Sequence, residues 1–124
     1  MPQDNKKFSE ELKKRIYNWI LRLIKFLDIL NKNDSLCRTV DGQLIRCGTS
    51  IGANVRESQN AESKTDFIHK LKIAAKEADE TEYWLLLCKN SEGFANCDTL
   101  LNNCSSIIKV LSKIIASSKT KPSH

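Results

Sequence analysis

Apolar residues recur every three or four positions in four long segments of the chain, which is the spacing of amphipathic α-helices that each bury one face. The first apolar stripe consists of Leu12, Ile16, Trp19, Leu23, Leu27 and Leu30. The second consists of Val40, Leu44, Cys47, Ile51 and Val55. The third consists of Phe67, Leu71, Ala74, Ala78, Thr81, Leu85 and Cys88, and the fourth of Leu100, Cys104, Ile107, Leu111 and Ile114. The stripes predict helices over about residues 9–30, 36–60, 64–89 and 97–117, with a polar tail over 118–124.

Four helices of this length, joined by short polar segments, predict a single all-α domain over residues 1–124, an antiparallel up-down four-helix bundle. The 4 glycines and 2 prolines argue against a turn-rich β-sandwich, and 40% hydrophobic residues argue against disorder. No apolar run approaches the roughly 18 residues that a membrane span requires. Because the start of the chain is also polar, we expect a cytoplasmic protein with no membrane partner.

Three features offer more apolar or small surface than the core of one subunit requires. Segment 83–87 is apolar all the way round its predicted helix, and the fourth helix has a wide apolar arc. In the second helix Gly48 and Gly52 share a face, which indicates either the close approach of another helix backbone or a slightly bent helix. Exposed apolar surface usually marks association between molecules. We therefore predict a symmetric homo-oligomer.

Positive charge is concentrated in the first and last quarters of the chain. The formal net charge is +5; the balance is +4 over residues 1–33 and +3 over 93–124, but 0 over 34–61 and −2 over 62–92. The candidates for phosphate contacts with nucleic acid are Lys7, Lys14, Arg15, Arg22, Lys25, Lys32, Lys109 and Lys113. The alternative is an ordinary solvated helix surface. Assembly favours polyanion binding, because several subunits multiply the charge.

A polar stripe runs along the second helix, and two glutamates lie one turn apart on the third. The residues are Arg46, Ser50, Asn54 and Glu57, followed by Glu77 and Glu80. A pair of carboxylates could act as an acid and a base, but no nucleophile–base set and no Gly-rich phosphate loop accompanies them. We favour a hydrogen-bonded network that sets helix register, in which Arg46 or Arg56 neutralises the acids. The chain is therefore expected not to be an enzyme.

The cysteines and histidines lack the spacing of a disulfide framework or a metal site. The cysteines are Cys37, Cys47, Cys88, Cys97 and Cys104. Their odd number and the lack of a Cys-x-x-Cys pair predict buried free thiols in a reducing compartment. Asp66 and His69 form one copy of a motif that di-iron bundles need on two helices, and His124 lies in the polar tail. We predict no metal and no other cofactor.

Two motifs in the second and third helices resemble those of a known family. One is Ser-Ile-x-x-Asn-x-x-Glu, formed by Ser50, Ile51, Asn54 and Glu57. The other is Glu-x-x-Glu-Thr-x-x-Trp, formed by Glu77, Glu80, Thr81 and Trp84. Both are similar to motifs of the bacterial four-helix-bundle protein family encoded in rRNA intervening sequences, also labelled the S23 ribosomal protein family. Ser58 stands where many relatives have glycine.

The resemblance implies an up-down bundle that assembles into a ring, with a homopentamer as the expected form. It also implies a similarity to pentameric accessory proteins of retroelements, which bind nucleic acid. Combined with the basic segments, it implies a non-enzymatic, ring-forming oligomer that binds structured RNA or DNA through its basic faces. The alternative is a protein–protein scaffold or adaptor that uses the apolar surplus and the surface beside the second helix.

Overall fold

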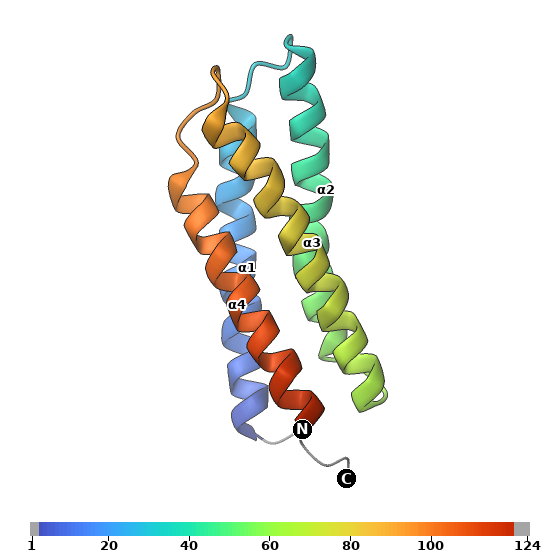
Figure 1. The fold of residues 1–124 in the computed structure, drawn as a ribbon. Helices are drawn as coiled ribbons and strands as arrows, with labels where there is room; N and C mark the ends of the chain where they lie inside the picture. The colour runs from blue at the N-terminus through green and yellow to red at the C-terminus, as the bar shows by residue number, and fades with distance from the viewer. Residues whose placement is uncertain (1–2, 121–124) are drawn as a thin grey trace.

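Four long α-helices make up the computed structural model, which describes residues 3–120 (Figure 1). They are α1 (Gln3–Asp28), α2 (Ser35–Ser58), α3 (Lys64–Asn90) and α4 (Asp98–Thr120). No strand occurs among these residues, and the side chains described are those of residues 10–119. The protein is therefore all-helical, as the apolar spacing predicted, and its helices pack alongside one another as a bundle.

The helix boundaries differ from the predicted ones mainly at the two ends of the chain. α1 begins at Gln3 rather than near residue 9. Residues 3–8 lack glycine and proline, so the helix extends there although no apolar stripe marks it. α4 continues to Thr120, so the predicted tail over 118–124 begins inside a helix. Residues 121–124 lie outside the described part of the chain.

Side-chain caps define where α2 and α3 begin. The Asp34 carboxylate accepts a hydrogen bond from the backbone N–H of Cys37 at 3.0 Å. The Ser63 hydroxyl oxygen accepts one from the backbone N–H of Asp66, also at 3.0 Å. The first N–H groups of a helix have no partner inside it, and such caps typically contribute about 1 kcal/mol. Each cap therefore ends the preceding polar connection at a defined residue.

The four predicted apolar stripes form the core. Every stripe residue is buried except Ile114, which is partly buried and packs against the others. Fully burying one leucine or isoleucine contributes about 1.5–3 kcal/mol. Burial of the stripes is therefore what holds the helices together, and it leaves the charged residues between the stripes on the surface.

Polar contacts show which helices are neighbours. Arg46 of α2 and Glu77 of α3 form an ion pair at 3.3 Å. The Ser105 hydroxyl of α4 donates to the Glu82 carboxylate of α3 at 2.6 Å. The Trp19 indole N–H of α1 donates to the Leu100 carbonyl oxygen of α4 at 3.0 Å. α1 therefore lies beside α4 as well as beside α2, although the whole middle of the chain separates α1 from α4 in sequence.

The two glycines on one face of α2 are explained by the close approach of α1. A Cβ atom at Gly48 would lie 2.5 Å from Leu23 Cδ2, and one at Gly52 would lie 2.9 Å from Ile20 Cδ1. The first of the two alternatives for these glycines is therefore confirmed, and the approaching helix is in the same chain. Gly48 is buried, so it supplies no surface for contacts between copies, contrary to the expectation from the sequence.

The other two apolar surfaces that we expected to exceed the needs of the core differ in their exposure. On α4, Leu101 is buried, and Ile108 and Ile115 pack against the core, so most of its apolar arc serves the bundle itself. At the end of α3 three large apolar side chains are exposed, as expected: Tyr83, Leu86 and Leu87. A second exposed stripe lies on α1 and was missed, although its helical spacing is visible in the sequence; it consists of Tyr17, Leu21 and Ile24.

Candidate functional site

The candidate basic residues that the structure describes are all on the surface. Those on α1, or just after it, are Lys14, Arg15, Arg22, Lys25 and Lys32, and those on α4 are Lys109 and Lys113. Lys7 lies in α1, but its side chain is outside the described set. Surface exposure is a requirement for phosphate contacts, but it also holds for ordinary solvated residues. The grouping of these side chains therefore matters more than their exposure.

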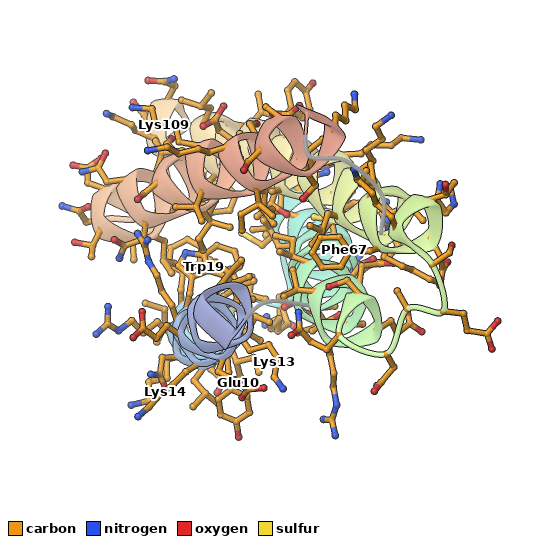
Figure 2. All side chains as sticks on the ribbon, turned by 90° about the horizontal axis from the view of Figure 1, so that it is seen from below. Glu10, Lys13, Lys14, Trp19, Phe67 and Lys109 are labelled. Atoms are coloured by element: carbon orange, nitrogen blue, oxygen red, sulfur yellow. The ribbon has the colours of Figure 1, made fainter. Side chains whose placement is uncertain are left out.

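Three of the candidates line one groove between α1 and α4. This α1–α4 groove has a volume of about 370 Å³ and is lined by Glu11, Lys14, Arg15, Asn18, Trp19, Arg22, Asn103 and Ile107. Figure 2 shows Trp19 in the space between the two helices. The buried indole forms the floor of the groove. Lys14, Arg15 and Arg22 follow one another along its α1 side.

The α1–α4 groove carries a local excess of positive charge. Its lining includes three cationic side chains and one carboxylate, that of Glu11. Arg15 donates from Nη2 to the Ser106 hydroxyl oxygen at 2.6 Å, which holds its guanidinium at the edge of α4. Neither Lys14 nor Arg22 forms an ion pair with another side chain that the structure describes. Their charges remain available to an anionic ligand.

The polar residues of this groove were only partly foreseen. Asn18 lies one turn from both Lys14 and Arg22, so helical spacing alone would have added it to the candidates. Asn103 comes from α4, and nothing in the sequence connects it with α1. Amide side chains supply both hydrogen-bond donors and acceptors. The two asparagines therefore add uncharged hydrogen-bonding groups beside the cations.

The remaining basic candidates lie elsewhere. The Lys32 ammonium forms an ion pair with Asp41 at 3.0 Å and donates to the Leu27 carbonyl oxygen at 2.5 Å. Its charge is thus compensated within the chain, and it is a poor phosphate ligand. Figure 2 places Lys109 on the side of α4 that is turned away from α1. Lys25 and Lys113 do not line the groove. The eight candidates therefore do not form one surface.

Arg46 of α2 holds the two glutamates of α3. Its guanidinium pairs with Glu77 at 3.3 Å and with Glu80, and it also donates from Nη2 to the Gln43 side-chain oxygen at 3.1 Å. Because Arg46 is half-exposed, such contacts typically contribute only about 1 kcal/mol or less each. Both carboxylates are therefore engaged by one guanidinium within the chain. This arrangement argues against a catalytic carboxylate pair.

The other members of the expected polar network are separate from this cluster. The Asn54 amide donates to the Ser50 carbonyl oxygen at 2.9 Å and to its hydroxyl at 3.1 Å, within α2. Glu57 pairs with Lys70 of α3 at 3.6 Å. Arg46 and Glu57 are about 16 Å apart along the helix axis, because each residue advances 1.5 Å. The single predicted network is therefore three separate groups of contacts.

All five cysteines are buried free thiols. Burial raises the pKa of the Cys88 thiol, and likewise that of Cys104, to about 12. Burial also raises the pKa of Cys47 and of Cys97. Since the thiolate is the reactive form of cysteine, none of these four thiols is suited to nucleophilic catalysis.

The raised pKa values predict a loss of stability in alkaline solution. At pH 8 both Cys88 and Cys104 are almost fully protonated in the folded and the unfolded chain, so their ionisation has little effect there. Between pH 9 and about 12 the unfolded chain loses these protons and the folded chain retains them. The free energy of unfolding should therefore be lower at pH 10 than at pH 8 by about 1 kcal/mol per thiol. Urea titrations at the two pH values measure this difference.

The control for this measurement is Cys104→Ala, which removes one of the two thiols. Its pH 8 to pH 10 difference should be smaller than that of the wild-type protein by about 1 kcal/mol. An equal pH dependence in the two proteins would show that Cys104 ionises as readily in the folded chain as in the unfolded one. The alanine variant also separates the thiol contribution from that of lysine and tyrosine groups, which it leaves unchanged.

The described residues offer no metal site and no membrane span. Within residues 10–119, no three His, Cys, Asp or Glu side chains are grouped so that they could hold a metal ion. Asp66 and His69 are therefore without further ligands there, and His124 is outside the described part. Over residues 3–120, no helix has the length and apolar character needed to cross a membrane.

Comparisons with known proteins agree with the fold and the motifs. The family model of the 23S rRNA-intervening sequence protein matches residues 6–113. A crystal structure of a protein with unknown function from the S23 ribosomal protein family of Bacteroides thetaiotaomicron is 37% identical to this chain, with a TM-score of 0.76. The match covers 84% of this chain and 97% of that one. No curated protein matches the chain. The sequence and the structure together show that the chain belongs to the family of 23S rRNA-intervening sequence proteins.

Proposed function

We propose that this protein is a non-enzymatic helical-bundle protein of the cytoplasm that binds structured RNA or DNA through its α1–α4 groove. Its four helices run up and down in antiparallel order, and copies of the chain assemble into a ring, for which five subunits is the expected count. The observation that carries the proposal is the row of Lys14, Arg15 and Arg22 along one open groove. Phosphate groups are the ligands that such rows of cations favour.

The contacts between helices support the antiparallel order. Arg46 near the middle of α2 meets Glu77, while Glu57 near its end meets Lys70 near the start of α3. Similarly, Arg15 meets Ser106 and the later residue Trp19 meets the earlier residue Leu100. In both helix pairs, higher residue numbers on one helix lie beside lower numbers on the other. This is the order that short connections between consecutive helices favour.

The lining of the groove favours contacts with the phosphate backbone over contacts with bases. Trp19, its aromatic residue, is 3% exposed, and its N–H is already bonded to Leu100. It therefore offers no face on which a base could stack, unlike the aromatic platforms of proteins that bind single strands. The cations of the groove bind a phosphate backbone by charge and shape, and Asn18 and Asn103 are the lining groups that could contact base edges.

Reversing two charges in the groove should weaken binding of nucleic acid. The variant Lys14→Glu with Arg22→Glu removes two phosphate ligands and adds two anions. We expect the affinity for an RNA hairpin or a DNA duplex in 0.1 M KCl to fall at least about tenfold, and the slope of log K against log salt to decrease by about 2. Fluorescence anisotropy titrations at 50 and 200 mM KCl measure both effects.

The matched control is Lys72→Glu with Lys76→Glu, which makes the same change in net charge on the exposed side of α3. It should retain most of the affinity, because neither lysine lines the α1–α4 groove. Equal losses in the two double variants would indicate binding by net charge alone. If the wild-type protein does not bind either probe at 50 mM KCl, the proposal is wrong.

A scaffold or adaptor function is the second candidate, and the exposed apolar end of α3 favours it. Tyr83, Leu86 and Leu87 are each at least 40% exposed and lie within two turns of one helix. Such clusters mark contacts with other protein surfaces. Purification of the wild-type protein with a specific protein partner, together with the lack of nucleic-acid binding, would support this candidate over the first.

A further inference from the structure

A second groove lies between α1 and α2 and has mostly apolar walls. This α1–α2 groove has a volume of about 710 Å³, and its walls include Tyr17, Ile20, Gly52 and Ala53. At Gly52 the Ile20 side chain packs directly over α2, and Tyr17 is 62% exposed. Apolar walls that open to solvent offer a surface on which another molecule can dock.

Positive charge prevails at the edge of the α1–α2 groove. The edge carries Lys13, Lys14 and Arg56 together with Glu10 and Glu11. Figure 2 shows Glu10 and Lys13 on the side of α1 that is turned away from α4 and Trp19. Lys13 and Glu10 pair with each other at 3.2 Å. Lys14 and Arg56 make no ion pair with a described side chain, so they can attract a carboxylate from another molecule.

The exposed end of α3 has the complementary properties. Its apolar side chains Tyr83, Leu86 and Leu87 are exposed, and so are the carboxylates of Asp79, one turn before Tyr83, and of Glu92, just after the helix. The nearby Lys89 ammonium pairs with Asp98. The surrounding segment 62–92 has a balance of −2, whereas segment 1–33, which forms α1, has +4. One chain therefore carries an apolar hollow with a cationic edge and, on a different helix, an apolar projection with anionic neighbours.

We propose that the exposed end of α3 docks into the α1–α2 groove of a second copy of the same chain. This inference rests on the proposed assembly into a ring, and it names the two surfaces that meet. The contact buries the apolar side chains of both surfaces and places the acidic side of the α3 end near Arg56 at the edge of the groove. Opposite charges at the edge of an interface mainly fix orientation and partner choice, while the buried apolar area supplies the affinity.

The contact is heterologous, because the two surfaces are different parts of the chain. After two copies join, one α1–α2 groove and one α3 end remain uncovered, so further copies add until the assembly closes. A closed ring covers every groove and every α3 end. Glu11 and Lys14 line both grooves, whereas Arg15, Trp19 and Arg22 line only the α1–α4 groove, so assembly through this contact leaves those three residues accessible.

Two single variants each disable one of the two surfaces. Ala53→Glu places an anion inside the groove, where it faces the carboxylates of the docking copy. Leu86→Glu places a charge at the centre of the α3 end. Both residues are exposed, so the isolated bundle should fold normally, as circular dichroism will show. Burying an unpaired charge in an apolar contact is costly, so we expect the dissociation constant of the assembly to rise at least about 100-fold in each variant.

Ile29→Glu is the matched control, because it makes the same charge change at an apolar residue that is 67% exposed and belongs to neither surface. Sedimentation velocity at about 20 μM should find the wild-type and Ile29→Glu proteins assembled and the other two variants monomeric. An equimolar mixture of Ala53→Glu and Leu86→Glu should then form dimers and no larger species. One intact groove and one intact α3 end remain in that mixture, so one contact can form.

The outcomes separate this inference from the proposed function. If both variants stay assembled like the wild type, the subunits meet through other surfaces, and the inference is wrong while the ring proposal stands. If the variants are monomeric but their mixture gives no dimer, the contact is not heterologous, and the inference is also wrong. A monomeric wild-type protein contradicts both the ring and the inference. The anisotropy titrations of the wild-type protein test nucleic-acid binding separately. Because Lys14 lines both grooves, the Lys14→Glu with Arg22→Glu variant is also checked for assembly by sedimentation velocity.

Discussion

Replacing Trp19 with alanine should lower the free energy of unfolding by about 3–5 kcal/mol. The indole is 3% exposed and fills the space between α1 and α4, and its N–H donates to the Leu100 carbonyl oxygen at 3.0 Å (Figure 2). The substitution leaves a large cavity and removes this hydrogen bond between α1 and α4. Urea unfolding followed by circular dichroism measures the change. Wild type and variant must be compared at one protein concentration, because the proposed assembly would add to the apparent stability.

Trp19→Phe is the control that separates volume from hydrogen bonding. It retains most of the aromatic volume but has no N–H, so we expect a loss of about 1–2 kcal/mol. Trp19 is also the floor of the α1–α4 groove, so the alanine variant should bind nucleic acid more weakly even where it is still folded. A Trp19→Ala protein as stable as the wild type would contradict the described packing of α1 on α4.

Gly48→Val should lower the free energy of unfolding by about 1–3 kcal/mol, although valine favours a helix more than glycine does. A Cβ atom at this position would lie 2.5 Å from Leu23 Cδ2 and 3.7 Å from Trp19 Cζ3. Both neighbours are buried, so neither can move aside without disturbing the core. α1 would have to shift away from α2. Thermal unfolding and urea titration both report the effect.

Gly42→Ala is the opposite case on the same helix. No atom lies within 4 Å of a Cβ at Gly42, and the residue is exposed. The alanine should therefore raise the free energy of unfolding by about 0.5–1 kcal/mol through helix propensity alone. If both glycine variants are stabilised, α1 does not approach α2 as closely at Gly48 as described. If both are destabilised, the effect is not one of local space.

The spacing of apolar residues was sufficient to predict the number of helices, their approximate bounds and the buried face of each. This works because a helical face is a property of neighbouring residues. When leucine or isoleucine occupies every third or fourth position, these side chains share one face of the helix. The free energy of the helix is lowest when that face is buried. The Ser63 cap could be recognised for the same reason, since both of its partners lie within four residues. Three cations of the α1–α4 groove also follow from helical spacing along α1.

Contacts between helices could not be predicted in this way, because they join residues far apart in sequence. Arg46 has several acidic residues within the reach of a neighbouring helix, and its choice of Glu77 and Glu80 depends on how α2 and α3 slide past each other. Whether Gly48 faces its own chain or another copy depends on the position of α1. The sequence could not distinguish the two, since both require a small residue.

In the candidate site, too, local sequence determines some features and the packing of separate helices determines others. Helical spacing selected Lys14, Arg15 and Arg22, but it also selected Lys32, which Asp41 neutralises across the turn between α1 and α2. The groove itself exists because Trp19 brings α4 beside α1, and Asn103 joins it from a helix that begins far along the chain. Local patterns therefore specify which side chains are cationic and exposed. The packing of separate helices specifies which of those cations share one surface and keep their charge available.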